Sequence, residues 1–195
     1  MAFFRTINFS DPLPTIAGEG VVLRTPQVTD YSEWVALREA SRDFLTPWEP
    51  TWPADDLSRT AFRRRIRRYA EDLRTDLGYA FLILRSSDDA LVGGLTLANI
   101  RRGVAQAGSL GYWMGKPHAR QGYMTAAVRA VIPFAFSTLR LHRLEAACIP
   151  TNNGSIKLLE KTGFTREGYA REYLCINGTW QDHLLYARLK DGVKS

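Results

Sequence analysis

The chain has 195 residues, of which 45% are hydrophobic and 24% charged, as in an ordinary globular domain. This length predicts a single domain over 1–195, and no apolar run is long enough to cross a bilayer. The net charge of +6 favours an anionic ligand or an RNA-rich setting, although many proteins are this basic for solubility alone.

Cysteines, histidines and the first residues set further expectations. Cys148 and Cys175 are too few for a disulfide framework and lie in apolar runs, so we expect buried free thiols. The three histidines are scattered, which predicts no metal site. The beginning of the chain lacks the pattern of an export signal, so a cytoplasmic location is expected.

The first half of the chain alternates apolar runs with helical and turn signals. We expect an irregular N-terminal arm, a strand, two helices and a hairpin, over 1–19, 21–25, 30–40, 55–76, 79–84 and 91–100. The segment 44–53 holds three prolines and two tryptophans, Trp48 and Trp52. Such a stiff loop either forms a pocket wall or covers the core, and the sequence does not separate the two.

The helix expected at 55–76 has one strongly cationic face. Its arginines are Arg59, Arg63, Arg64, Arg65, Arg67, Arg68 and Arg74. A run of this kind is usually a solvated face paired with nearby acids. The alternative is a docking surface for RNA or the ribosome, over 59–74.

The second half predicts a parallel crossover and a closing hairpin. We expect strands and helices over 109–114, 125–139, 143–149, 152–163, 164–176 and 180–189. The strands at 109–114 and 143–149 flank a helix, which predicts a right-handed parallel crossover in a mixed α/β or α+β sheet. Ligands favour the carboxyl ends of such strands, so a pocket is expected between Met114 and Ile149. Pro133 should bend or shorten the crossover helix.

The stretch 109–127 joins a strand to a helix through a turn rich in Gly, Pro and cations. Unpaired N–H groups at a helix N-terminus bind phosphate, and Gly122 allows close backbone approach. An ordinary helix cap would look much the same. The other motifs of the chain therefore decide how this stretch is interpreted.

Four segments together resemble the GNAT superfamily of acetyl-CoA-dependent N-acetyltransferases. They read LGYWMGKPHARQGYMTAAVRAV, NNGSIKLLEKTGF, PWEP and EGYAREYLCINGTWQDHLLYARL, the last two resembling the ribosomal-protein alanine N-acetyltransferase branch. The resemblance implies a twisted, mostly antiparallel sheet of about seven strands flanked by about four helices. The phosphate loop departs from the family pattern, since Ala119 replaces Gln/Arg and Met124 replaces a small residue.

The resemblance also implies site residues. Acetyl-CoA, the co-substrate, would contact Tyr112, Trp113, Met114, Arg120, Gln121, Gly122, Tyr123, Met124, Thr125 and Asn152. Glu172 matches the general base, with Glu167 as a rival, and regular strand alternation would let only one of them face the pocket. Ser155 matches the group that protonates or positions the leaving thiolate. Acceptor contacts are expected from Trp48, Glu49, Tyr173 and Asp182.

The expected reaction is direct transfer of acetyl to an amine. By resemblance the leading acceptor is the N-terminal alanine of a ribosomal protein. Two alternatives remain, a small-molecule amine acetyltransferase and a non-catalytic, RNA-associated factor that binds coenzyme A. The oligomeric state is not predicted.

Overall fold

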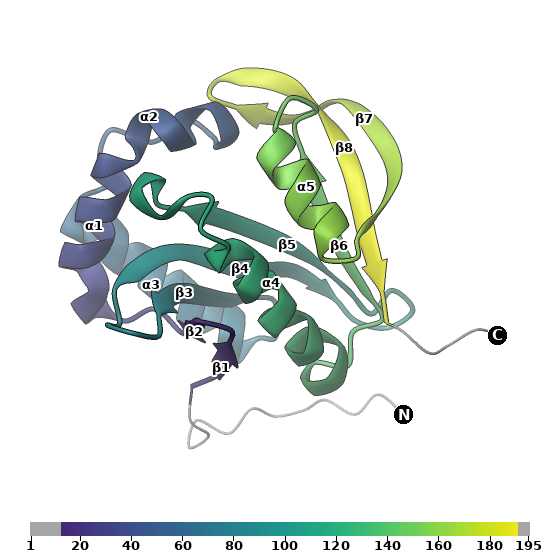
Figure 1. Ribbon diagram of the computed structural model, residues 1–195, viewed down its shortest axis with the longest axis horizontal. Coiled ribbons are helices and arrows are strands. Elements are labelled where there is room, and N and C mark those ends of the chain that lie inside the picture. The colour runs from purple at the N-terminus through teal and green to yellow at the C-terminus, as the bar shows by residue number, and fades with distance from the viewer. Residues whose placement is uncertain (1–12, 191–195) are drawn as a thin grey trace.

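The computed structural model describes residues 13–190 and shows one eight-stranded sheet flanked by helices (Figure 1). The strand order is β1-β2-β3-β4-β5-β6-β8-β7. The strands are β1 Thr15–Gly18, β2 Val21–Arg24, β3 Tyr79–Arg85, β4 Leu91–Arg101, β5 Ala107–Met114, β6 Arg143–Cys148, β7 Thr165–Ile176 and β8 Thr179–Leu189. The helices are α1 Tyr31–Ala40, α2 Arg42–Leu45, α3 Arg59–Arg74, α4 Tyr123–Pro133 and α5 Asn153–Lys161. Among these strands β5 and β6 run parallel and the other neighbours antiparallel, so the expected mixed sheet is confirmed.

Helices cover both faces of the sheet (Figure 1). On one face, α4 and α5 pack on the main core, where Val128, Leu144 and Leu159 are fully buried. On the other face, Trp34 of α1 and Phe62 of α3 pack against β3 and β4. The central strands are therefore apolar on both sides, which explains the continuous hydrophobic run at 79–84.

Three expectations about local structure were wrong. The arm expected at 1–19 contains β1, which pairs with β2, and its first twelve residues lie outside the described part. The second helix begins at Arg59 rather than near residue 55, because Ser58 Oγ accepts the N–H of Ala61 and caps it. Cys148 is buried as expected, but Cys175 is exposed on the edge strand β7.

Pro133 ends α4 without breaking the crossover. The chain continues from Phe134 to Thr138 as a π-helical turn, which accommodates a ring that cannot donate an N–H. The hairpin turn at Asn177 and Gly178 is confirmed: both residues have positive φ, 46° and 80°, as a two-residue type I′ turn requires.

The parallel pair β5–β6 separates partway along its length. Pairing covers Ala107–Ser109 against Arg143–Glu145 and then stops, although β5 continues to Met114 and β6 to Cys148. We call the unpaired ends, residues 110–114 and 146–148, the fork. It lies at the carboxyl ends of two parallel strands, at the place where the sequence predicts a pocket. No helix of the described residues is long and apolar enough to cross a membrane.

Candidate functional site

The fork leaves one backbone edge of β5 without a neighbouring strand. On its other edge, Tyr112, Trp113 and Met114 pair with Leu95, Gly94 and Gly93 of β4. A ligand carrying amide groups can therefore add to the free edge as another strand would. Gly111 contributes to this opening, because a Cβ built on it would meet no atom within 4 Å.

The loop before α4 is shaped for an anion. Arg120 and Gly122 have positive φ, 62° and 89°, and no side chain caps the helix at Gly122. The first N–H groups of α4, those of Tyr123, Met124 and Thr125, therefore point out of the helix end unpaired by a cap. Backbone concavities formed by such conformations bind phosphate, so these residues fit a pyrophosphate group.

Side chains of the same loop are largely engaged in structure. Gln121 Nε2 donates to the carbonyl of Pro117 at 2.9 Å, which closes the loop on itself. Tyr123 and Met124 are partly buried against the main core. Arg120 is exposed. The fit to an anion thus rests on backbone geometry, and the departures at Ala119 and Met124 do not disturb it.

A pair of hydroxyl groups spans the fork. Tyr112 Oη of β5 lies 2.5 Å from Ser155 Oγ in the first turn of α5. Burial raises the pKa of Tyr112 above its ordinary value, and the hydrogen bond with Ser155 opposes this only in part. Cys148, at the end of β6, also neighbours Ser155, and burial raises the pKa of its thiol. Both groups are thereby held in their protonated, neutral forms.

Asn152 positions Ser155 through the backbone. Its Oδ1 accepts the N–H of Ser155 at 3.0 Å and so caps α5. The cap fixes the first turn of α5, whose free N–H groups and dipole favour negative charge. Asn152 is therefore the N-cap of α5, and a coenzyme contact by its side chain stays a prediction.

On the opposite face of β5 lies a cavity of about 440 Å³. Its aromatic walls come from α1, α3, β3, β5 and the loop before α3, and include Trp34, Trp52, Phe62 and Trp113. Tyr112 packs with the main core while Trp113 packs with the core on this other face, because neighbouring strand residues point to opposite sides. A single strand thus separates the hydroxyl pair from the cavity.

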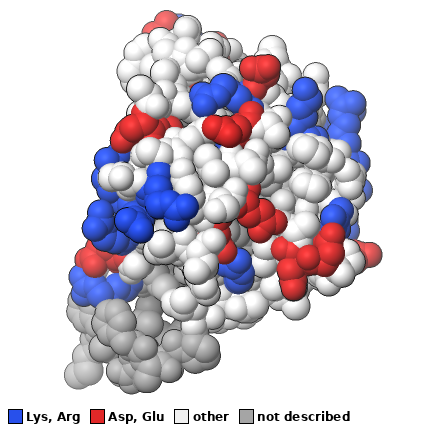
Figure 2. Space-filling view, turned by 90° about the vertical axis from the view of Figure 1, so that its left-hand side faces the viewer, with Lys and Arg blue, Asp and Glu red and all other residues white. Residues whose placement is uncertain are grey.

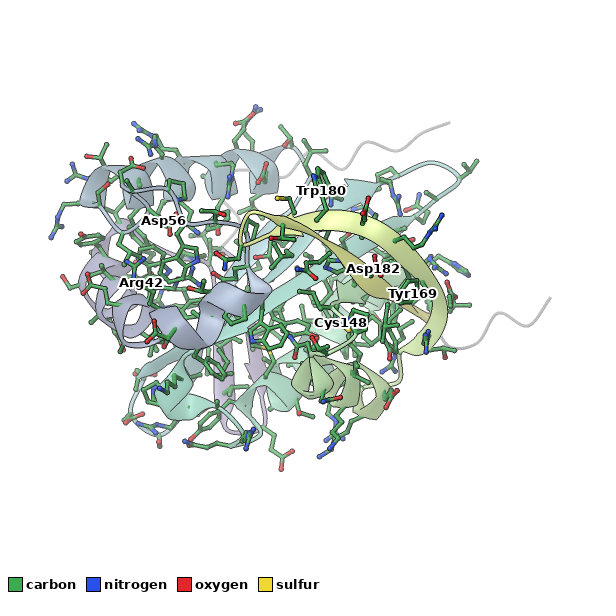
Figure 3. The ribbon with its side chains drawn as sticks, turned by 90° about the horizontal axis from the view of Figure 1, so that it is seen from above. Arg42, Asp56, Cys148, Tyr169, Trp180 and Asp182 are labelled. Carbon is green, nitrogen blue, oxygen red and sulfur yellow. The ribbon has the colours of Figure 1, made fainter. Side chains whose placement is uncertain are left out.

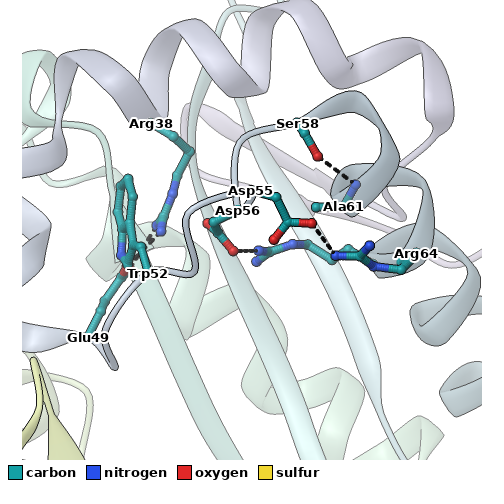
Figure 4. Close-up of polar contacts among 9 residues, drawn as sticks. Arg38, Glu49, Trp52, Asp55, Asp56, Ser58, Ala61 and Arg64 are labelled. Carbon is teal, nitrogen blue, oxygen red and sulfur yellow. Dashed lines mark hydrogen bonds and ion pairs between the residues drawn. The ribbon is translucent and has the colours of Figure 1, made fainter.

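Arg38 organises the cavity wall (Figure 4). Only 5% of its surface is exposed, and it donates two hydrogen bonds to the carboxylate of Glu49, at 2.8 and 2.7 Å. Trp52 Nε1 donates to the same carboxylate, and the Arg38 guanidinium lies 4.1 Å from the Trp52 ring centre and 5.0 Å from that of Trp113. Planar, bidentate pairing of this kind fixes both side chains.

The loop that carries Glu49 is held from a second side. The backbone N–H of Asn177, at the tip of the β7–β8 hairpin, donates to the carbonyl of Glu49 at 2.9 Å. The stiff segment 44–53 therefore forms a pocket wall through Glu49 and Trp52, both of which line the cavity. Trp48 is 37% exposed and is absent from the lining, so the structure does not bring it to this site.

The β7–β8 hairpin carries the predicted base in a bulge. Residues 171–173 of β7 stand opposite the single residue Asp182 of β8. Glu172 has φ of 46°, and its backbone N–H donates to Asp182 Oδ1 at 2.8 Å, while Tyr169 Oη donates to Oδ2. The Tyr169 hydroxyl, and then this N–H, lower the pKa of Asp182. Asp182 thus holds the bulge, and Figure 3 shows it beside Tyr169.

Side chains do not alternate regularly between the two faces along β7. The expectation that alternation lets only one of Glu167 and Glu172 face the pocket therefore fails. The register shifts at Arg166/Gly168 and again at Ala170/Leu174. Glu167 is paired with Arg143, whose hydrogen bonds hold its pKa below the ordinary value. Neither Glu167 nor Glu172 lines the cavity, and Glu172 is exposed. Tyr173 is also exposed and packs edge-on against His183.

Sequence reasoning missed Arg38 and the hydroxyl of Tyr112. A signal for Arg38 was present, because it follows Trp34 by four residues and so lies on the inner face of its helix. A charged residue at that position predicts a buried partner. Tyr112 was expected only as a coenzyme contact, and no local pattern signals its contact with Ser155, because the two residues are 43 positions apart.

The arginines of α3 are in part paired, as a solvated face would be. Arg64 binds Asp55 and Arg65 binds Asp56, each at 2.7 Å, and Arg74 binds Glu71. The two aspartates expected to open the helix thus lie in the preceding turn and each pairs with one of its arginines. Among residues 13–190 no three His, Cys, Asp or Glu side chains are grouped as metal ligands.

Comparison with known proteins identifies the family to which a chain with this fold and site belongs. Residues 21–165 match the model of the acetyltransferase (GNAT) domain. The chain is 41% identical over 174 residues to the probable N-acetyltransferase YjcK of Bacillus subtilis, covering 89% of this chain and 96% of YjcK. It is 33% identical over 147 residues to the ribosomal protein uS5-alanine N-acetyltransferase of Escherichia coli, covering 75% of this chain and 76% of that enzyme.

A solved structure agrees with the described fold. Mycobacterium smegmatis RimJ, in complex with CoA-disulfide, superposes with a TM-score of 0.86 at 29% identity, covering 96% of this chain and 91% of that chain. The fork, the phosphate-shaped loop and the matched family point to the same co-substrate. The chain therefore belongs to the GNAT family and is an acetyl-CoA-dependent N-acetyltransferase.

Proposed function

We propose that this enzyme acetylates the N-terminal amine of a protein, with an alanine N-terminus of a ribosomal protein as the leading acceptor and the cytoplasm as its location. The cavity against β5 carries the proposal, because its volume of about 440 Å³ suits the first residues of a chain. The 33% identity to the ribosomal protein uS5-alanine N-acetyltransferase of Escherichia coli supports the proposal. The aromatic walls suit a small apolar side chain beside the amine.

The chemistry of the acceptor also favours a chain terminus. Transfer forms a C–N bond and breaks a C–S bond, while the amine loses a proton and the thiolate gains one. An α-amino group has a pKa of about 7.7–8.0, against about 10.4 for lysine. A substantial fraction of N-termini is therefore neutral near pH 7.5 without strong base catalysis, and a weak base suffices.

We assign to the hydroxyl pair, Tyr112 and Ser155, the role of supplying the proton that the departing thiolate gains. Ser155, in the first turn of α5, binds the departing sulfur, and Tyr112 replaces the proton that Ser155 gives up. Burial keeps Tyr112 protonated before the reaction, and a proton from solvent, which takes up the proton released by the amine, restores it after each turnover. The N-terminal dipole of α5 stabilises the developing negative charge.

On the amine side we keep Glu172 as the base, acting through water. A non-glycine residue with positive φ is strained, and such strain persists where the surrounding structure holds it. Here Asp182 of β8 fixes the conformation, because its carboxylate accepts the backbone N–H of Glu172. Bulges are common beside active sites because they re-aim a side chain.

The test is release of coenzyme A thiol from acetyl-CoA in the presence of different amines. Hexapeptides that differ only in beginning with Ala, Ser or Met are compared with polyamines and aminoglycosides, and an N-acetylated Ala peptide serves as the control. We expect the Ala peptide to give the highest kcat/KM and the blocked peptide no release. A higher kcat/KM for a small amine than for every peptide would overturn the proposal in favour of a small-molecule acetyltransferase.

A further inference from the structure

A second hollow along α3 adjoins the cavity beside β5. This hollow, which we call the groove, has a volume of about 260 Å³. Pro53, Asp56, Arg65 and Arg68 line both spaces. A ligand whose first residue occupies the cavity therefore has a path outward across α3.

Most charges along this path are neutralised within the protein. Arg38 is paired with Glu49 and Arg64 with Asp55 (Figure 4). Arg65 is paired with Asp56. Arg68 is the exception among the arginines that line the two spaces. It is exposed, and its recorded contact within residues 13–190 is the ring of Tyr69, 5.5 Å away. The path thus presents one cation that no described carboxylate pairs.

We propose that the groove binds the residues that follow the acceptor's N-terminus, and that Arg68 pairs with a carboxylate side chain among them. The inference rests on the proposed function, since it extends the same acceptor site. A guanidinium pairs well with a carboxylate, because its planar donors match the two oxygens. An acceptor carrying Glu or Asp soon after its N-terminus is therefore preferred over one carrying Gln or Asn.

A protein segment fits this surface better than RNA does. Single-stranded nucleic acid needs a continuous row of cations with exposed aromatic rings for stacking. On the face shown in Figure 2 the basic side chains are interspersed with acidic ones. Arg63 and Arg67 are exposed but line neither the cavity nor the groove, so the cations of α3 do not form one track into the site.

The experiment measures binding and turnover separately. Ala-initiated hexapeptides carry Glu at position 2, 3, 4 or 5, each matched by a Gln peptide. Dissociation constants are taken from tryptophan fluorescence of the CoA-saturated enzyme, since Trp34, Trp52 and Trp113 line the cavity. At one position at least, we expect the Glu peptide to bind about twofold to fivefold more tightly, in line with a charged pair at an exposed side chain.

Two variants test whether Arg68 causes the preference for Glu peptides. Arg68→Gln should remove the Glu preference, and Arg68→Glu should replace it with a preference for Lys at the same position. Arg67→Gln, the matched control, should leave the preference intact. Equal binding of Glu and Gln peptides at every position in the unmodified enzyme overturns the inference. A single-stranded RNA that binds through Arg68 while the peptides show no Glu preference also overturns it, in favour of a nucleic-acid surface.

The outcome is distinct from that of the proposed function. A Glu preference in binding without acetyl transfer to any peptide would reject the N-terminal acetyltransferase and retain an acidic-peptide site. Transfer to Ala peptides without a Glu preference would retain the N-terminal acetyltransferase and reject the acidic-peptide site.

Discussion

The fork and the cavity lie on opposite sides of β5 and offer a ligand different atoms. The fork presents a free strand edge, the first N–H groups of α4 and two hydroxyls, with Gln121 and Asn152 engaged in holding the backbone. The cavity presents tryptophan rings and arginines, of which Arg38 and Arg65 are paired with carboxylates. Backbone recognition tolerates sequence change, whereas the identity of the acceptor depends on side chains. We therefore expect fork variants to change cofactor binding or turnover, and cavity variants to change stability and acceptor preference.

The largest expected effect is on the cavity side. Arg38→Met leaves the Glu49 carboxylate and Trp52 Nε1 without their shared partner, and should lower the free energy of unfolding by about 3 kcal/mol or more, measured by urea denaturation. Arg42→Met is the control, since exposed Arg42 stacks on the same Trp52 ring at 4.7 Å, and should cost less than about 1 kcal/mol. Similar losses for the two variants would contradict a special role for the Arg38–Glu49 pair.

The next effect tests the hydroxyl pair at the fork. Tyr112→Phe and Ser155→Ala should each lower kcat by about 10²-fold, within the range for a proton donor, while stability changes by about 1 kcal/mol. The double variant should be no slower than the slower single variant, because groups that act as a unit are not additive. Multiplicative losses would show that the two hydroxyls act separately.

The pH dependence of the same reaction checks the state of Tyr112. Because burial raises its pKa, the phenol stays protonated as the acceptor amine loses its proton. The rate with an Ala peptide should therefore rise through about pH 8, near the α-amino pKa, and stay level up to about pH 10. A fall between about pH 8 and 10 that disappears in Tyr112→Phe would mean that Tyr112 ionises at an ordinary pKa.

A smaller effect is expected at the bulge. Glu172→Gln should lower kcat by less than the roughly 10²-fold typical of a general base, because the α-amine is already partly neutral near pH 7.5. It should leave the affinity for acetyl-CoA unchanged, because β7 and β5 are not neighbours in the sheet. Glu167→Gln is the matched control, since Glu167 is paired with Arg143, and should keep full turnover. An unchanged rate and pH profile in Glu172→Gln would remove this residue from the mechanism.

The smallest effect concerns the phosphate loop. Gly122→Ala places a side chain at φ of 89°, which costs on the order of 1–2 kcal/mol, while the added Cβ meets no atom within 4 Å. The dissociation constant of coenzyme A, measured by calorimetry, should rise about fivefold to twentyfold. Arg120→Gln should raise it less, if the backbone dominates recognition. The opposite order would mean that charge, not loop geometry, binds the pyrophosphate.

The sequence alone determined the elements with strong local signals. The Asn177-Gly178 turn, the alternating and continuous apolar runs and the Gly122 loop are encoded within a few residues, so the mixed sheet, the crossover and the family could be predicted. Where two local signals competed, the helix began at a different residue from the one expected. Asp55 and Asp56 resemble a helix cap, yet Ser58 caps α3 and the aspartates bind arginines instead.

Only the tertiary structure decided which side chains meet. The contact of Tyr112 with Ser155, the pairing of Arg38 with Glu49 and the clamp of Asn177 on Glu49 join residues from different elements. The exposure of Trp48 and Cys175 and the bulge at Glu172 likewise depend on strand register and on the edge position of β7. Local sequence fixes backbone conformation, but long-range packing sets distance and burial, and these decide which predicted residues can share a site.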